Sequence, residues 1–272
     1  MTWKIDAETR ICASLANPNR KTTAPIMHNA GFEAVGANLR YFALEPTDIG
    51  SAMAAIRALG FVGVSVSKPF KEKVIQYLDE IDDTARRIGA VNVVHNIDGI
   101  LKGYNSDWIG AIGALEEQVE LEGQVVAVLG AGGAARAVAF GLVLRGAEVH
   151  IFNRTEERGS RLSSEIGVNW GGPLENAEEL KANIVVNATP VGRQDAEVAP
   201  VGRKAIERAD VVMDINVQKG MSKLLADAAS SGAKTIAGVR MLVLQGVFAF
   251  ELFSGKTAPI DVMQAAVIAA LK

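Results

Sequence analysis

The chain has 272 residues, 49% of them hydrophobic, and a formal net charge of −3 at pH 7. This length suits one large domain or two smaller ones with a real core, and no apolar run is long enough to cross a bilayer. The chain carries no basic stripe, so we expect neither a nucleic-acid nor a membrane partner. The single cysteine, Cys12, cannot form an internal disulfide, which favours the reducing cytoplasm.

Strand-like and helix-like segments alternate along the chain, which predicts an α/β fold with a mainly parallel sheet. In the first part, strands are expected at residues 10–15, 39–44, 62–66, 91–95 and 100–104, and helices at 25–35, 49–59, 69–87 and 108–119. Asp98-Gly99, between the last two of these strands, is a strong hairpin signal. In the second part, strands are expected at 125–129, 148–152, 184–187 and 211–215, and helices at 136–144, 241–253 and 260–271. We expect the last two helices to pack back on the first domain, so that a cleft forms between two units.

The most informative stretch is the turn after the apolar run 125–129, which reads Gly130-Ala131-Gly132-Gly133-Ala134-Ala135. Strand, glycine turn and helix form the context that a dinucleotide-binding fingerprint requires. Gly130 permits a tight turn, Gly132 permits the close approach of a pyrophosphate, and Ala135 replaces the third glycine of the pattern. The first N–H groups of the helix would then face the phosphates. The context favours a nucleotide site over the alternative, a tight turn without a ligand.

The strand at 148–152 is followed by Asn153-Arg154-Thr155, with Arg158 one helical turn further on. An NAD site would carry an acidic residue here to bind the ribose 2′-hydroxyl, and this chain has none. Guanidinium groups bind a 2′-phosphate through paired hydrogen bonds. The pattern therefore favours NADP over NAD, with a solvated basic patch at a helix start as the alternative.

Two segments ahead of the glycine turn carry candidate chemical groups. In the first, Lys68, Lys71 and Lys73 crowd at the start of the expected helix 69–87. The helix dipole and mutual repulsion would both favour loss of a proton from a lysine there, which suits proton transfer. Lysines that are merely solvated are an equal alternative.

The second segment, residues 103–107, ends a hairpin strand and opens a helix at Asp107. An aspartate at such a position is commonly only a helix N-cap. Asn92, between the two segments, is either a polar group of a site or a turn residue. The three histidines have no metal-ligand spacing, so we expect no metal: they are His28, His95 and His150.

Several short motifs, taken in order, resemble those of the shikimate dehydrogenase family. They are Ser65-Val66-Ser67-Lys68-Pro69-Phe70-Lys71, Gly89-Ala90-Val91-Asn92, Gly103-Tyr104-Asn105-Ser106-Asp107, the glycine turn, Asn153-Arg154-Thr155, Asn187-Ala188-Thr189-Pro190-Val191-Gly192 and residues 238–245. The resemblance implies an N-terminal α/β catalytic domain, residues 1–106, completed by C-terminal helices at 240–272. It places a Rossmann NADP-binding domain at 107–239. It also implies oxidation of the ring hydroxyl of shikimate with NADP, or reduction of 3-dehydroshikimate, in the route to aromatic amino acids.

The same resemblance implies roles for individual residues. Lys71 and Asp107 match the family's catalytic pair, in which the lysine, held by the carboxylate, relays the hydroxyl proton while hydride leaves for the nicotinamide. The implied substrate-binding set is Thr22, Ser67, Asn92 and Gln245. An amide in an apolar helix, such as that of Gln245, can instead satisfy a backbone group. The implied cofactor-binding set is Gly130, Ala131, Gly132, Gly133, Ala134, Asn153, Arg154, Thr155, Arg158, Thr189, Ile215 and Gly238.

Several positions depart from the family pattern. The two serines that fix the substrate carboxylate in the family are Thr22 and Ala24 here, so one hydroxyl is lost. The phenol of the family's Asp-x-x-Tyr is replaced by Val217, and the usual Asn of the first motif is Ser65. The catalytic pair is unchanged. The pattern is typical of a divergent, shikimate dehydrogenase-like branch.

We therefore expect an NADP-dependent dehydrogenase of shikimate or a close cyclic hydroxy acid, acting as a monomer or homodimer. A dehydrogenase of quinate, aminoshikimate or another polyol acid is the alternative, and a weakly active NADP-binding regulatory protein is the second alternative. The retained catalytic pair argues against the regulatory protein, whereas the lost phenol at Val217 argues for it. Three cations are candidates to compensate for the lost carboxylate contact: Arg20, Lys21 and Lys68.

Overall fold

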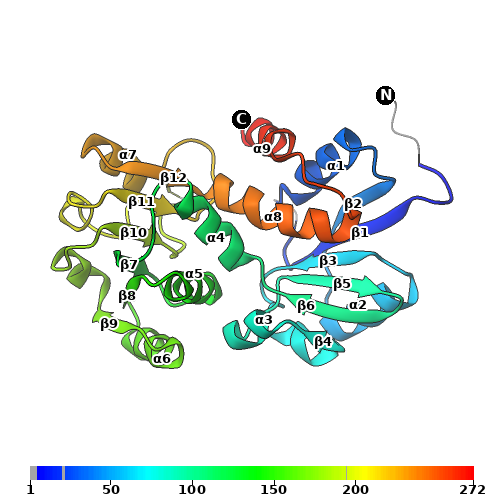
Figure 1. Ribbon diagram of the computed structural model, residues 1–272, viewed down its shortest axis with the longest axis horizontal. Coiled ribbons are helices and arrows are strands. Elements are labelled where there is room, and N and C mark those ends of the chain that lie inside the picture. Colours follow the sequence, from blue (N-terminus) through cyan, green and yellow to red (C-terminus); the bar gives the residue numbers. More distant parts are fainter. Residues whose placement is uncertain (1–4, 20–21, 194) are drawn as a thin grey trace. The chain divides into compact units, whose positions relative to one another are not determined.

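The computed structural model describes residues 5–19, 22–193 and 195–272. The chain divides into two compact units, one of Met1–Ser106 with Gln245–Lys272 and one of Asp107–Leu244. The two units therefore divide after residues 106 and 244, whereas the domain limits expected from the sequence follow residues 106 and 239. Each unit is built on its own six-stranded sheet (Figure 1). The predicted α/β class is therefore confirmed.

The sheet of the first unit is mixed, with three parallel and two antiparallel pairings of neighbouring strands. Its order is β2-β1-β3-β5-β6-β4. Strand β5 runs antiparallel to both of its neighbours, while β1 is parallel to β2 and β3, and β4 is parallel to β6. The bounds are β1 Arg10–Leu15, β2 Leu39–Leu44, β3 Gly63–Val66, β4 Glu80–Ile81, β5 Val93–Ile97 and β6 Ile100–Tyr104.

The antiparallel pairing has a local cause in the turn between β5 and β6 (Figure 1). Asp98 and Gly99 both have positive φ, 51° and 88°. Two consecutive residues with positive φ form the tight turn that matches the twist of two adjacent antiparallel strands. The hairpin predicted from Asp98-Gly99 is confirmed by the pairing of Ile97 with Ile100.

Helices cover both faces of this sheet. They are α1 Ala24–Ala34, α2 Ile49–Ala58, α3 Asp83–Ile88, the second half of α8 Gly238–Ser254 and α9 Ile260–Ala270. Helix α2 buries Ile49, Met53 and Ile56 in the same core cluster as Leu15 of β1 and Val66 of β3. Helix α1 packs against α9, and the rings of Phe32 and Phe250 stack with their centroids 5.0 Å apart.

The long helix expected at 69–87 is wrong. The chain there forms a 3-10 helix, Lys73–Tyr77, then β4 and then α3. Asp79 pairs with Leu101 through both its backbone N–H, at 3.0 Å, and its carboxylate, at 2.7 Å, and this draws β4 beside β6. Asp82 then starts α3 by accepting hydrogen bonds from the backbone N–H groups of Thr84 and Ala85. Pairing with a distant strand therefore overrides the helical pattern of the segment.

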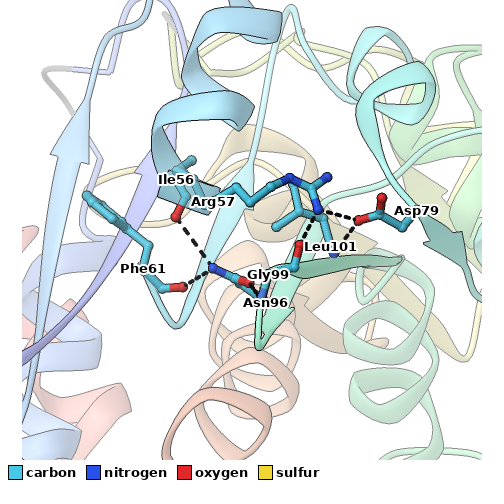
Figure 2. Close-up of polar contacts among 7 residues, drawn as sticks. All are labelled: Ile56, Arg57, Phe61, Asp79, Asn96, Gly99 and Leu101. Atoms are coloured by element: carbon cyan, nitrogen blue, oxygen red, sulfur yellow. Dashed lines mark hydrogen bonds and ion pairs between the residues drawn. The ribbon is translucent and has the colours of Figure 1, made fainter. Parts of the chain in front are cut away.

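Figure 2 shows how α2 and the hairpin are fixed to each other. Arg57 of α2 donates to the carbonyl oxygen of Gly99 and lies 2.9 Å from the carboxylate of Asp79. Asn96 donates to the carbonyl oxygen of Phe61 at 2.9 Å and accepts from the N–H of Gly99 at 2.9 Å. The Arg57 hydrogen bond is the main cause that lowers the pKa of Asp79. These contacts hold the hairpin that leads to residues 103–107.

The sheet of the second unit is entirely parallel, in the order β12-β11-β10-β7-β8-β9. Counted within the unit, this is the strand order 3-2-1-4-5-6, which defines the Rossmann fold. Its strands are β7 Val125–Leu129, β8 Glu148–Phe152, β9 Asn169–Gly172, β10 Ile184–Asn187, β11 Val211–Asp214 and β12 Lys234–Ala237. The point where the strand order reverses lies between β7 and β10, where ligands of such sheets bind.

Apolar residues on alternate positions of these strands supply both faces of the second core. Val126 and Val128 belong to one cluster with residues of α4 and α5, whereas Ala127 and Leu129 belong to a second cluster with residues of α7. The helices are α4 Asp107–Glu116, α5 Gly133–Leu144, α6 Glu156–Ile166 and α7 Lys223–Ser230, with short 3-10 helices at Leu174–Glu178 and Arg203–Ala205. No helix in the described ranges is both long and apolar enough to cross a membrane.

Candidate functional site

The glycine turn between β7 and α5 is shaped by close backbone packing on one side and by open space on the other. Gly130 has φ +113°, and a Cβ placed on it would lie 3.0 Å from the carbonyl oxygen of Ala188. A Cβ on Gly132 or Gly133 would meet nothing within 4 Å. Helix α5 begins at Gly133 without a side-chain cap. Its first N–H groups therefore remain available to an anion that approaches over Gly132.

A second feature of the same sheet edge is a cluster of polar side chains, which we call the Asp214 cluster: Asn187, Thr189, Asp214, Asn216 and Ser222. The Asp214 carboxylate accepts from the Asn187 amide at 3.1 Å and from the Ser222 hydroxyl at 2.7 Å. It also accepts from the backbone N–H of Asn216 at 3.1 Å and its side-chain amide at 3.0 Å. The cluster ties the loop after β10 to the loop after β11.

Two expected cofactor residues, Thr189 and Ile215, are held in place by this cluster. The Thr189 hydroxyl donates to the Asn187 amide oxygen at 2.7 Å, and the Ile215 N–H donates to the Asn187 carbonyl oxygen at 3.1 Å. Position 238 requires a glycine for a steric reason, because a Cβ there would lie 2.5 Å from the carbonyl oxygens of Ile215 and Asn216. Its glycine is therefore required by packing against this loop.

The residues after β8 form an exposed basic segment. Asn153 donates to the carbonyl oxygen of Thr155 at 2.7 Å, and Thr155 precedes α6. Arg154 and Arg158 are exposed, and within the described ranges neither forms an ion pair with a carboxylate. Arg161 on the same helix differs, because it lies 3.9 Å from Glu165. The guanidinium groups of Arg154 and Arg158 are therefore not paired with a carboxylate in the described ranges, at the position where the sequence predicts a contact with the 2′-phosphate.

In the first unit, the expected residues Ser67 and Lys71 lie in the turn that follows β3. Ser67 is exposed, and its N–H donates to the carbonyl oxygen of Leu15 at 2.8 Å, just after β3. Lys71 is half-buried, and its carbonyl oxygen accepts from the N–H of Val91 at 2.9 Å. No long helix begins at this point, so the helix-dipole argument for Lys68, Lys71 and Lys73 is wrong.

The start of α1 carries the positions expected to hold a carboxylate. The Thr22 hydroxyl accepts from the N–H of Ala24 at 3.3 Å, and both residues are half-buried. Lys68 is exposed. Arg20 and Lys21, the other two cations considered above, lie outside the described residues. Of the two positions that carry serines in the family pattern, Thr22 therefore keeps its hydroxyl and Ala24 has none.

Asn92 and Ser106 form a buried pair next to Asp107. Asn92 donates to the Ser106 hydroxyl at 3.1 Å, and its amide oxygen accepts from the Ser106 N–H at 2.7 Å. Asn92 is 5% exposed, Ser106 1% and Asp107 4%. Asp107 is the first residue of α4, so it follows the N-cap position instead of occupying it. Asn92 is therefore more than a turn residue, because its side chain fixes the segment that carries Asp107.

Gln245, on α8, is half-buried, and its amide forms no hydrogen bond within residues 5–19, 22–193 and 195–272. It does not satisfy a backbone group there, so that alternative is wrong. The sequence assigns no role to the buried residues Ser106, Asp214 and Ser222 or to the half-buried Asn216. Ser106 stands inside a recognised motif, whereas the Asp214 cluster has no contiguous signal. No group of His, Cys, Asp and Glu side chains in the described ranges could hold a metal ion.

Comparison with known proteins identifies the family. Residues 15–94 match the shikimate dehydrogenase substrate binding domain, residues 114–226 match shikimate / quinate 5-dehydrogenase, and residues 238–268 match the shikimate 5'-dehydrogenase C-terminal domain. The chain is 38% identical to the shikimate dehydrogenase (NADP(+)) of Methanothermobacter thermautotrophicus, with 96% of each chain covered. The chain belongs to the shikimate dehydrogenase family.

Solved structures related to the shikimate dehydrogenase family share the fold. Shikimate 5-dehydrogenase from Thermus thermophilus, in complex with NADP(H) and shikimate, is similar with a TM-score of 0.89 at 35% identity, over 96% of this chain and 100% of that one. The ligand-free 5-ketofructose reductase of Gluconobacter sp. strain CHM43 is similar with a TM-score of 0.89 at 30% identity, over 96% and 99%. The predicted family and fold are thus confirmed.

Proposed function

We propose that this protein is an NADP-dependent dehydrogenase that interconverts shikimate, or a close cyclic hydroxy acid, and its 3-dehydro ketone. The observation that carries the proposal is the open space over Gly132 and Gly133, at the start of α5, which has no side-chain cap and follows a strand of a Rossmann sheet. A pyrophosphate fits that space because backbone N–H groups and the helix dipole face it. Exposed Arg154 and Arg158 supply the charge that a 2′-phosphate needs.

The oxidised nicotinamide supplies the hydride acceptor when the cofactor is bound. The chain's own residues then have to bind the ring, orient it and accept one proton. Lys71 Nζ hydrogen-bonds the reacting hydroxyl and takes its proton as the carbonyl forms, and the Asp107 carboxylate orients both Lys71 and a neighbouring ring hydroxyl. The proposed contacts to the rest of the ring come from Thr22, Ser67, Asn92 and Gln245.

The decisive test is a substrate panel scored by NADPH formation, with Lys71→Ala and its neighbour Lys73→Ala as a matched control. The panel contains shikimate, quinate and aminoshikimate, and 5-ketofructose is tested in the reverse direction by NADPH consumption. Loss of general acid–base assistance is worth about 10²–10⁴-fold, so Lys71→Ala should lower kcat by that factor with the Kd of NADPH unchanged. Lys73, which is exposed, should tolerate the change. Full activity of Lys71→Ala would overturn the assignment, and NADPH binding without turnover on any substrate would favour the regulatory alternative.

A second candidate substrate, another cyclic hydroxy acid or polyol, is favoured by Ala24 and Val217, where the family pattern has a hydroxyl and a phenol. A hydrogen bond to a charged group is worth roughly 1.5–3 kcal/mol, so the loss of one should weaken shikimate about ten- to a few hundredfold. The double variant Ala24→Ser with Val217→Tyr should then improve kcat/KM for shikimate selectively. A wild type already efficient on shikimate, and unchanged by these substitutions, would exclude this candidate. The expectations of a cytoplasmic monomer or homodimer without nucleic acid stay predictions.

A further inference from the structure

Ser106 stands one residue before α4, at the position where a serine usually caps a helix. Its hydroxyl is used differently in this protein. Within the described ranges its polar contacts are with the Asn92 side chain, at 3.1 Å from the amide nitrogen and 3.4 Å from the amide oxygen. The Ser106 N–H donates to the same amide oxygen at 2.7 Å. Asn92 and Ser106 therefore form a reciprocal pair, and the capping role does not account for this serine.

Asn92 is itself fixed by the strands on either side of it. Its N–H donates to the carbonyl oxygen of Tyr104 at 3.0 Å, and its carbonyl oxygen accepts from the N–H of Val66 at 2.8 Å. The preceding residue, Val91, donates its N–H to the carbonyl oxygen of Lys71 at 2.9 Å. Val91 therefore binds the backbone of Lys71, and the next residue, Asn92, binds the side chain of Ser106.

We propose that Ser106 is a positioning residue for the reaction, because its bonds to Asn92 hold the segment that carries the Asp107 carboxylate. This inference rests on the proposed function of Lys71 and Asp107. Asn92 and Ser106 are almost fully buried, so water does not replace a lost partner and a hydrogen bond between them is strong. A displacement of about 1 Å in a catalytic group can cost 10²-fold in rate. Ser106 contributes through geometry and needs no contact with the substrate.

The test compares Ser106→Ala with Ser106→Thr, which keeps the hydroxyl. Ser106→Ala should lower kcat roughly 10- to 100-fold with the Kd of NADPH unchanged, and Ser106→Thr should restore kcat to within a few-fold of wild type. Ser163→Ala is the matched control, because Ser163 is also a buried serine, 3% exposed, whose hydroxyl donates to the carbonyl oxygen of Gly159 at 3.0 Å. That control should lose stability and keep kcat at saturating cofactor.

Crystal structures of the wild type and both Ser106 variants give a readout that needs no substrate. The Asp107 carboxylate should be displaced in Ser106→Ala and remain in place in Ser106→Thr. An undisplaced Asp107 with wild-type kcat in Ser106→Ala would overturn the inference, as would a kcat loss that Ser106→Thr fails to rescue. Failure of the proposed function is a separate result, since the wild type itself would then oxidise no ring hydroxy acid with NADP.

Discussion

The glycine turn and the Asp214 cluster both lie at the carboxyl ends of strands in one parallel sheet. They differ in whether their polar groups form hydrogen bonds within the chain. At the turn, α5 starts without a side-chain cap and the space over Gly132 is open. In the cluster, the Asp214 carboxylate accepts hydrogen bonds from Asn187, Asn216 and Ser222 and is only 2% exposed. One region leaves donors for a ligand, and the other satisfies its polar groups within the chain.

The difference teaches how the two regions divide the work of binding. The first backbone N–H groups of α5 can donate hydrogen bonds to any phosphate. A substitution that adds a side chain at Gly132 or Gly133 would block this approach. The cluster binds its buried carboxylate within the chain, and Asn187 holds the Thr189 hydroxyl and the Ile215 N–H through hydrogen bonds. Substitutions should therefore affect the cluster through stability and the open side of the turn through affinity.

The largest effect is expected for Asp214→Ala, which removes the acceptor from several buried donors at once. Each unsatisfied buried donor costs about 1–3 kcal/mol, so the free energy of unfolding should fall by roughly 3 kcal/mol or more. Urea unfolding measures this change. Asp210→Ala, at an exposed position in the same unit, is the control and should change little. Equal losses in the two variants would show that the cluster does not carry the stability assigned to it.

Gly130→Ala should cost about 1–3 kcal/mol of unfolding free energy, because a residue with a side chain is strained at that backbone geometry. Its φ is +113°, and the new Cβ would press on the Ala188 carbonyl oxygen at 3.0 Å. Thermal and urea unfolding without cofactor give the value. A variant as stable as wild type would mean that the turn relaxes, and that its shape is not imposed by the loop after β10.

Gly132→Ala should separate affinity from stability. Its Cβ would enter open space, so the free energy of unfolding should change by less than about 1 kcal/mol, the scale of a lost N-cap preference. The methyl group would occupy the approach to the α5 N–H groups, and the Kd of NADPH should rise about tenfold or more, equivalent to 1.4 kcal/mol. Titration of NADPH fluorescence measures it. Unchanged affinity would contradict a pyrophosphate over Gly132.

Arg154→Ala tests the outer end of the open region. The side chain is exposed, so the contact with a 2′-phosphate should be worth about tenfold in kcat/KM for NADP, near the lower end for a charged hydrogen bond. Activity with NAD should not change. Arg161→Ala is the control, because Arg161 faces Glu165 on the same helix. Equal use of NADP and NAD by the wild type would contradict the cofactor preference.

The smallest effect expected is on the pH dependence of stability and concerns His28. This imidazole is buried, is not open to a ligand, and has a ring nitrogen without a hydrogen-bond partner in the described ranges. Its ring stacks on Tyr41 with centroids 4.3 Å apart, and its Nδ1 has no partner in the described ranges. Burial lowers the pKa of His28 from 6.5 to about 3. The unfolded chain therefore binds the proton first, and stability falls as the pH falls from about 6.5 towards 3.

Over the single unit from pH 6 to pH 5, this residue should account for about 1 kcal/mol of lost unfolding free energy, since one proton is worth 1.36 kcal/mol per pH unit. His28→Phe keeps an aromatic ring against Tyr41 and should flatten the acid side of the stability profile. Identical slopes for wild type and His28→Phe would contradict a neutral, buried imidazole.

The two regions also differ in how well the sequence predicts them. The glycine turn is contiguous, and its context of strand and helix is readable, so its elements and its openness follow from the sequence. The Asp214 cluster joins residues from 187 to 222 that meet only when β10 and β11 pair. For the same reason the helix expected at 69–87 is wrong, because the pairing of Glu80 with Lys102 decides that segment.

Within the first unit, sequence motifs show which residues belong to the candidate site, but they do not show where the side chains of those residues point. The residues of the motif that ends at Asp107 are plain in the sequence, but the turning of the Ser106 hydroxyl towards Asn92 depends on the pairing of β5 with β6. The mixed character of the first sheet is likewise implicit in Asp98-Gly99, since a tight two-residue turn joins only antiparallel strands. Local signals of this kind outweigh the average tendency of alternating strands and helices.

The discontinuity of the first unit has a consequence for synthesis on the ribosome. Residues 107–244 form an uninterrupted unit, but the first unit needs residues 245–272, which are synthesised after that whole unit. Phe250 and Phe253 of α8 pack against Gly31 and Gly63, so part of the first sheet and of α1 stays uncovered until residues 245–272 have been made. The nascent chain therefore exposes an apolar surface on residues 1–106 while residues 107–244 are being synthesised, and such a surface makes it prone to aggregate.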